Sequence, residues 1–246
     1  MTVWQVHMLN ARGALTPIMA EIRAHAREVV ELVSARLDLP RFDLVVRRGD
    51  AVIPEWGIAG HAPSAGVIEL VLDPDRVDPE HFRRMLARQM FHLTRWEMVP
   101  VDRSLGEALV AAGLAGHFVT DLLGGGADPW DQVRPGSGML KQAAALWARR
   151  DQDMGEWFQG RGRMRKWSGH GLGHRIVAEH LTEGGDAAAL VHASADGFRP
   201  ALRRLMAMEG VEEPEALDPP VAEEEAAEAP GGEAGGASPP GPPEDI

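Results

Sequence analysis

The chain has 246 residues, with 37 acidic and 25 basic side chains and no cysteine. Eleven carboxylates lie in residues 212–246, which have no Lys or Arg, so the first 211 residues carry 26 acidic against 25 basic groups. This near-neutral body argues against a non-specific nucleic-acid binder, and the missing cysteines exclude disulfides and thiolate metal sites. No signal-like segment and no membrane-spanning apolar run is visible. We therefore expect a cytoplasmic protein without a nucleic-acid or membrane partner.

The first third of the chain is predicted to form a small sheet and one helix. The helix begins at Thr16 and carries an apolar stripe to Leu37, with the period of an amphipathic helix. Residues 52–66 contain several glycines and prolines and are predicted as a loop that turns Trp56 and Ile58 inward. Runs of apolar residues predict three strands: residues 2–9, 42–46 and 67–72.

Helices dominate the rest of the sequence. An Asp-Pro pair at residues 78–79 begins a predicted helix that ends at Trp96, and a capping box begins another at Ser104 that ends at Gly124. Strands that come early and helices that come late indicate an α+β fold, predominantly helical. Further helical segments are predicted at residues 138–152, 170–181 and, as a pair, 187–208.

The chain is predicted to hold one folded domain and one tail. Residues 1–211 are long enough to bury a core as a single domain. Residues 212–246 contain eight prolines, five glycines and eleven carboxylates. A segment of this composition cannot bury enough apolar area to offset the entropy of ordering, so a disordered acidic tail is predicted.

Four stretches carry a resemblance to a known family, in matching order and spacing: residues 57–60 with 68–75, 86–95, 105–118 and 157–174. Over nearly all of residues 1–210 the chain resembles a bacterial family catalogued as a domain of unknown function and described as predicted zinc-dependent proteases. The resemblance implies a gluzincin-like metalloprotease scaffold, with a small N-terminal sheet followed by a helical part. In such enzymes His-Glu-x-x-His on one helix and a Glu on the next hold zinc and activate water.

This chain departs from the family pattern at the site itself. The resemblance places Arg88 at the first His of the motif, Gln89 at the general-base Glu and Ala112 at the third ligand, so that only His92 remains. One imidazole does not assemble a zinc site, and a guanidinium about 4 Å from the metal costs about 4 kcal/mol per unit of like charge at a dielectric near 20. Gln89 cannot accept a proton. A pseudoprotease without catalytic residues, metal or cofactor is therefore predicted, with His92 as a vestigial ligand.

We expect the remaining cleft to bind a peptide or protein partner. Arg88 is interpreted either as a group that recognises a carboxylate or as one half of an internal salt bridge with Glu97 or Glu107. Residues 67–72 are a candidate edge strand for pairing with an extended peptide. The candidate partner-binding residues are Arg88, Gln89, His92, His170, His174 and Trp167.

Two other functions remain open. One is an active zinc metallopeptidase with relocated ligands, in which His92, His170 and His174 hold the metal. The other is a structural or assembly subunit in which Trp or Met side chains fill the cleft. The basic stretch at residues 161–166 is interpreted as a solvated loop, with a phosphate or RNA contact as the alternative.

Overall fold

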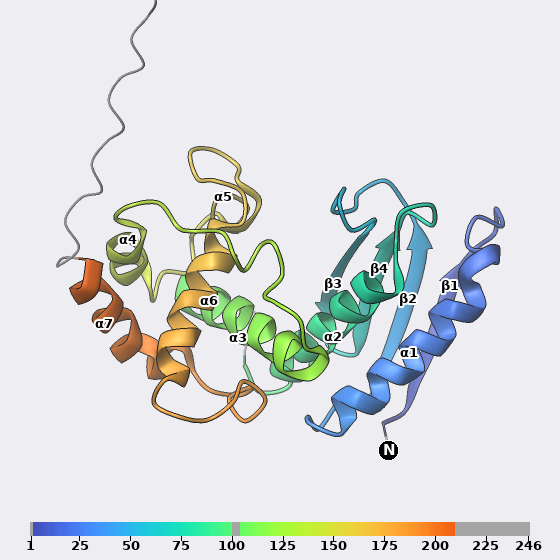
Figure 1. Ribbon diagram of the computed structural model, residues 1–246, viewed down its shortest axis with the longest axis horizontal. Coiled ribbons are helices and arrows are strands. Elements are labelled where there is room, and N and C mark those ends of the chain that lie inside the picture. The colour runs from blue at the N-terminus through green and yellow to red at the C-terminus, as the bar shows by residue number, and fades with distance from the viewer. Residues whose placement is uncertain (1, 100–103, 210–246) are drawn as a thin grey trace, which may run out of the picture. The chain divides into compact units, whose positions relative to one another are not determined.

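The computed structural model describes residues 2–99 and 104–209 of the chain (Figure 1). The predicted disordered tail at residues 212–246 lies outside this part. A four-stranded sheet has the order β1-β2-β4-β3, in which β1, β2 and β4 are parallel and β3 is antiparallel to β4. The strands are β1 (Trp4–Leu9), β2 (Phe42–Arg48), β3 (Ile58–Ser64) and β4 (Val67–Leu72).

Seven α-helices are described in the same part of the chain, and they confirm the predicted α+β, predominantly helical class. Two of them, α2 and α3, match the predicted bounds within one residue, because the side chains of Asp78 and Ser104 cap their starts and Gly124 ends α3. Short 3₁₀ turns lie at residues 16–18 and 195–198. The helices are α1 (Met19–Ser34), α2 (Pro79–Trp96), α3 (Leu105–Leu123), α4 (Met139–Leu146), α5 (Met154–Gln159), α6 (Ser168–Leu181) and α7 (Arg199–Glu209).

One face of the sheet is apolar and the other is polar. Figure 1 shows α1 and α2 on the same face, where strand residues such as Leu44 and Leu70 are completely buried. On the opposite face, His7 pairs with Asp43 at 2.9 Å, and both side chains are about half exposed. Alternation of buried and exposed residues along β1 and β2 accounts for this division. The apolar face packs against α2, which contacts β3 and β4. The helix that carries Arg88, Gln89 and His92 therefore lies beside the edge of the sheet.

The prediction of a loop at residues 52–66 is wrong, because residues 58–64 form β3. Its glycines and prolines are compatible with an edge strand, which needs fewer ladder hydrogen bonds than a central one. Gly60 lies so close to Leu70 and Met85 that an added Cβ would be 2.7 and 3.0 Å from them. Residues 67–72, whose place in the sheet the sequence does not determine, are not at the edge, since β4 pairs on both sides and β3 is an edge strand.

The predicted helix bounds also need correction in the last third. The helix predicted at residues 138–152 is shorter, because α4 ends at Leu146, and a separate short helix, α5, covers residues 154–159. The expected helix pair at 187–208 contains one α-helix, α7, preceded by turns and a 3₁₀ segment. Two glycines with positive φ precede these turns, and Asp186 accepts a hydrogen bond from the Ala189 N–H at 2.9 Å. Asp in this position stabilises a turn rather than a helix interior.

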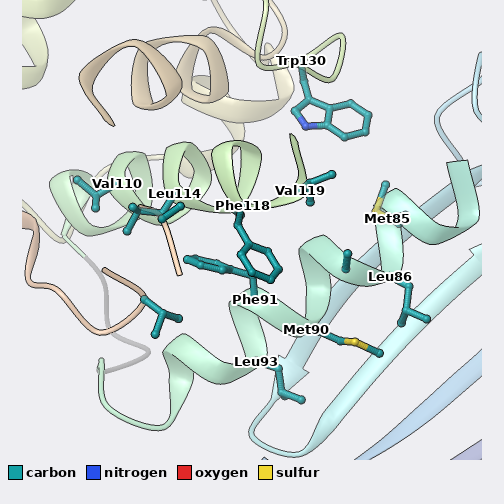
Figure 2. Close-up of a cluster of buried hydrophobic side chains, with 14 of the residues drawn as sticks. Met85, Leu86, Met90, Phe91, Leu93, Val110, Leu114, Phe118, Val119 and Trp130 are labelled. Atoms are coloured by element: carbon teal, nitrogen blue, oxygen red, sulfur yellow. The ribbon is translucent and has the colours of Figure 1, made fainter. Parts of the chain in front are cut away.

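Helices α2, α3 and α6 pack closely in the helical part. Figure 2 shows Phe91 of α2 and Phe118 of α3 in contact, with ring centroids 5.2 Å apart. Helices α3 and α6 approach through glycine, because a Cβ on Gly113 would overlap the Gly173 carbonyl and a Cβ on Gly173 would overlap the Leu109 carbonyl. These glycines therefore allow the backbones of α3 and α6 to pack in direct contact.

Candidate functional site

Two cavities lie where α2, α3, α5 and α6 meet, with volumes of about 220 and 510 Å³. Both are lined by His92 of α2 and His170 of α6, and we call the two cavities together the cleft. The smaller cavity is also lined by Ile53, Ala59, Gly60, Met85, Arg88, Gln89, Trp130 and Trp167. The larger is also lined by Ala108, Ala111, Ala112, Arg150, Gln152, Met154, Phe158 and Gln159.

Helix α2 presents the motif-like residues to the cleft. Its start is fixed by the Asp78 side chain, which accepts a hydrogen bond from the His81 N–H at 2.8 Å, as an N-cap residue does. Arg88 and His92 are four residues apart and therefore share one helical face. The Gln89 amide is buried and donates to the Met85 sulfur at 3.4 Å.

Arg88 belongs to a buried group of four charges, which we call the ion-pair cluster: Arg84, Arg88, Asp128 and Asp131. Arg84 Nε donates to Asp128 at 2.6 Å, Arg88 Nη2 donates to Asp131, and Asp128 is 3.6 Å from Arg88. Each side chain is at most 5% exposed. Buried charges of opposite sign offset one another's desolvation only when they are this close.

The structure thus gives Arg88 an internal salt bridge, but not with the residues predicted. Glu107 instead pairs with Arg95 at 2.6 Å, and Glu97 lies exposed at the end of α2. Three glycines end α3 and return the chain toward α2, where Arg84 donates to the carbonyls of Gly124 and Gly126 at 2.9 and 2.8 Å. Neither aspartate is predicted from the sequence, because only this return of the chain brings them to α2.

The ion-pair cluster is only partly satisfied by hydrogen bonds. Nε and Nη1 of Arg88, and Oδ1 of Asp131, have no hydrogen-bond partner within the described residues. Burial raises the pKa of Asp131 from 3.8 to about 7, and the charge of Arg88 opposes that rise. Unsatisfied buried polar groups are uncommon in folded proteins and often mark functional positions.

Trp130 covers Arg88 on the cleft side. Its ring is 3% exposed, with the Arg88 guanidinium carbon 5.1 Å from its centroid. Trp56 and Trp167 lie around it, at centroid distances of 4.6 and 6.0 Å. Figure 2 shows Trp130 apart from the Phe91 and Phe118 pair, on the loop after α3. One tryptophan that the sequence analysis did not single out therefore fills part of the cleft, and a cavity remains beside it.

The predicted histidines separate into two places. His170 meets Phe158 edge to face at 5.0 Å in the cleft, and burial with the nearby Arg88 charge lowers its pKa to about 3. His174 lies outside the lining of both cavities and stacks on His117 at 3.9 Å. Burial, followed by the charges of His117 and Arg88, lowers the pKa of His174 to about 4. The structure thus brings together Arg88, Gln89, His92, Trp167 and His170 but not His174.

The side chains of the cleft do not fit a zinc ion. Across residues 2–99 and 104–209, no three His, Asp or Glu side chains converge on a point that could hold a metal. Ala112 contributes only a methyl group to the lining, and Arg88 brings a positive charge. The relocated set of His92, His170 and His174 is not assembled, because His174 packs elsewhere. Within the same described part, no helix is long and apolar enough to cross a membrane.

Comparison with known proteins agrees with the expected family. A family model described as predicted Zn-dependent protease (DUF2268) matches residues 21–198. The matched region contains the whole cleft and the ion-pair cluster. A search of curated proteins finds no match. Since the family model covers well over half of the sequence, the chain belongs to this family of predicted Zn-dependent proteases.

Proposed function

We propose that this chain is a cytoplasmic pseudoprotease that binds an extended peptide segment of a partner protein in the cleft, without metal and without hydrolysis. The observation that carries the proposal is the position of Arg88. Its guanidinium is ion-paired with Asp131 inside a zinc-protease scaffold, where the family resemblance places a metal ligand, and open cavities remain beside it.

The chemistry of the cleft supports binding rather than cleavage. Hydrolysis by a metalloprotease needs a Lewis acid that polarises the carbonyl and a base that takes the proton of the attacking water. The carboxamide of Gln89 cannot take that proton. His170, with its pKa lowered to about 3, is neutral at pH 7 and lies beside the Arg88 charge. These groups can donate and accept hydrogen bonds to a bound chain, but they supply neither catalytic function.

Strand β3 offers backbone groups to such a chain. The Ile58 carbonyl accepts from the Ile53 N–H at 3.1 Å on the side away from β4. Because backbone groups alternate between the two sides of an antiparallel strand, the N–H and C=O of Gly60 are directed to that same outer side. Gly60 also lines the smaller cavity. An extended peptide that adds to β3 would therefore place its side chains in the cleft.

Selection from a random dodecapeptide phage library tests this proposal, with one variant that fills the cleft. Ala108 is half-buried on α3 and lines the larger cavity, so Ala108→Trp puts an indole into a space of about 510 Å³. Ala24→Trp is the matched control, because Ala24 is exposed on α1 away from the cleft. We expect enriched peptides to bind the parent chain and Ala24→Trp but not Ala108→Trp.

Three outcomes would contradict the proposal. Peptides that bind Ala108→Trp as well as the parent chain would place the binding surface outside the cleft, and failure to enrich any peptide would favour the assembly subunit, for which the buried Trp130 is the supporting observation. If the purified chain hydrolyses a peptide when zinc is added, and His92→Ala abolishes this activity, the chain is an active zinc metallopeptidase. Elemental analysis of untagged protein reports bound metal independently of activity.

A further inference from the structure

The cleft differs in charge from the rest of the chain. The whole sequence has a formal charge of −12. Among the residues that line the two cavities there is no Asp or Glu, and the ionised side chains there are Arg88 and Arg150. A working metalloprotease needs two carboxylates at such a place, one as ligand and one as base. Loss of both leaves a lining without acidic side chains, and because Asp131 offsets the charge of Arg88, attraction for a negatively charged ligand comes from the basic groups around the cleft.

A basic loop forms the rim of the cleft. It comprises residues 160–166 and contains Arg161, Arg163, Arg165 and Lys166, all exposed. Gln159, just before it, lines the larger cavity, and Trp167, just after it, lines the smaller one. Over residues 149–167 there are six Lys or Arg against three Asp or Glu, a net charge of +3.

The backbone holds this loop in place at Trp167. Trp167 has a φ of 69°, and it is the sole non-glycine residue with positive φ in the described part of the chain. A bulky residue in that conformation is strained, and it persists only where surrounding contacts enforce it. The Trp167 N–H donates to the Phe158 carbonyl at 3.2 Å, and the Trp167 ring lies 6.0 Å from that of Trp130. Trp167 therefore anchors the end of the basic loop beside the smaller cavity.

We propose that the segment bound in the cleft is acidic: its backbone pairs with β3, and its carboxylates face Arg150 and the basic loop. This inference rests on the proposed function and adds the chemical class of the ligand. Charge complementarity of this kind sets partner choice more than total affinity. A peptide fits better than a nucleic acid because β3 offers backbone groups that pair with another extended polypeptide.

Fluorescence anisotropy with three labelled twelve-residue peptides tests the inference. The peptides share one apolar pattern, and their polar positions are all Glu, all Gln or all Lys. We expect the Glu peptide to bind about tenfold more tightly than the Gln peptide, and raised salt to weaken its binding. A labelled twelve-residue oligouridine is the competing polyanion, and it is expected to bind more weakly than the Glu peptide.

Charge reversal in the basic loop provides the matched variants. Arg163→Glu with Arg165→Glu changes only exposed side chains and should weaken binding of the Glu peptide about tenfold. Arg23→Glu with Arg27→Glu makes the same change in net charge on the exposed face of α1 and should leave the affinity unchanged. Circular dichroism and thermal unfolding check that both double variants fold.

The outcomes separate the two proposals. Equal affinity for the Glu and Gln peptides, with both lost on Ala108→Trp, overturns the acidic ligand and leaves the peptide-binding function standing. Tighter binding of oligouridine, or equal loss in the α1 control variant, also overturns the acidic ligand. Absence of binding by all three peptides, together with a failed library selection, counts against both.

Discussion

Two buried arginines on the same helix have different surroundings. Arg95, 1% exposed, donates to the carbonyls of Val191 and Ala193 and to Glu107, at 2.6 to 2.9 Å. Glu107 in turn accepts from the Ala195 N–H at 2.7 Å. Arg88, two turns earlier and 3% exposed, donates to Asp131 and leaves Nε and Nη1 without a partner in the described chain.

This difference separates a structural position from a candidate functional one. Burial of the two guanidinium groups is nearly equal, so exposure alone does not distinguish them. Arg95 connects α2 to α3 and to the segment before α7, as a residue that holds elements together does. Arg88 faces the cleft with donors unused, and unsatisfied groups of this kind concentrate where a ligand binds. Substitutions at and around these two arginines test this difference.

Arg95→Met should have the largest effect on stability. The change removes three hydrogen-bond donations and leaves Glu107, whose side chain is 19% exposed, without its ion pair. Loss of one partner of a buried pair typically costs about 3–5 kcal/mol, so we expect about 4 kcal/mol in urea unfolding. Arg27→Met, at an exposed position of α1, is the control and should change stability by less than about 0.5 kcal/mol.

Arg88→Met should cost less, and it should add a pH dependence above pH 7 that Arg95→Met does not add. Burial already raises the pKa of Asp131 from 3.8 to about 7, so the unfolding free energy of the parent chain falls as pH rises from about 4 to 7. Loss of the Arg88 charge raises this pKa further, so the unfolding free energy of the variant continues to fall above pH 7. We expect a cost of about 3 kcal/mol at pH 8 and less at pH 6.

A double-mutant cycle checks the origin of that cost. Arg88→Met combined with Asp131→Asn removes both charges, so stability should recover to within about 1 kcal/mol of the parent chain and the added pH dependence should disappear. A double variant as unstable as Arg88→Met alone at pH 8 would show that Asp131 is not the group left unpaired.

Gly116→Ala should disturb the ion-pair cluster from the other side. An added Cβ would lie 2.5 Å from Asp131 Oδ2 and 3.1 Å from Arg88 Nη2, so the pair must move. We expect about 2 kcal/mol of destabilisation, in the range of overpacked cores. Gly136→Ala is the matched control, because no atom lies within 4 Å of its added Cβ. Equal stability of the two variants would contradict the close approach of α3 to the cluster.

His170→Phe should have the smallest effect on stability, and the effect should be measurable at acidic pH. The pKa of His170 is lowered from 6.5 to about 3, so its contribution to stability is present above pH 6.5 and is lost as pH falls toward 3. At pH 5 this loss amounts to about 1–2 kcal/mol. Unfolding of His170→Phe should therefore depend less on pH between 7 and 5. Phe158→Leu alters the same contact but keeps the imidazole, and it should retain the parent's pH dependence.

The sequence predicted the fold best where local signals determine structure. Helices α2 and α3 begin at Asp78-Pro79 and Ser104, whose side chains cap them, so their bounds follow from capping chemistry. Strand β3 was missed because its glycines and prolines are typical of loops, and only pairing with β4 makes it a strand. The last helical pair was overpredicted because the turns around Asp186 depend on backbone conformations that composition does not reveal.

The cleft was predicted in part. The motif-like spacing on α2 places Arg88, Gln89 and His92 together, as a helical period requires. His174 was wrongly grouped with them, because its ring turns to His117 and stacks there. Asp131 and Trp130 were missed for another reason: they lie on an irregular segment more than forty residues after Arg88 in the chain. No periodicity connects such residues, and only the folded loop brings them together.

The backbone contact between α3 and α6 affects how the cleft can adjust to a bound peptide. Glycines at positions 113 and 173 leave these helices no side-chain layer through which they could slide. Adjustment to a bound peptide therefore falls to residues 160–166, whose charged side chains are exposed. Substitutions there can change which ligand binds without altering the contact between α3 and α6.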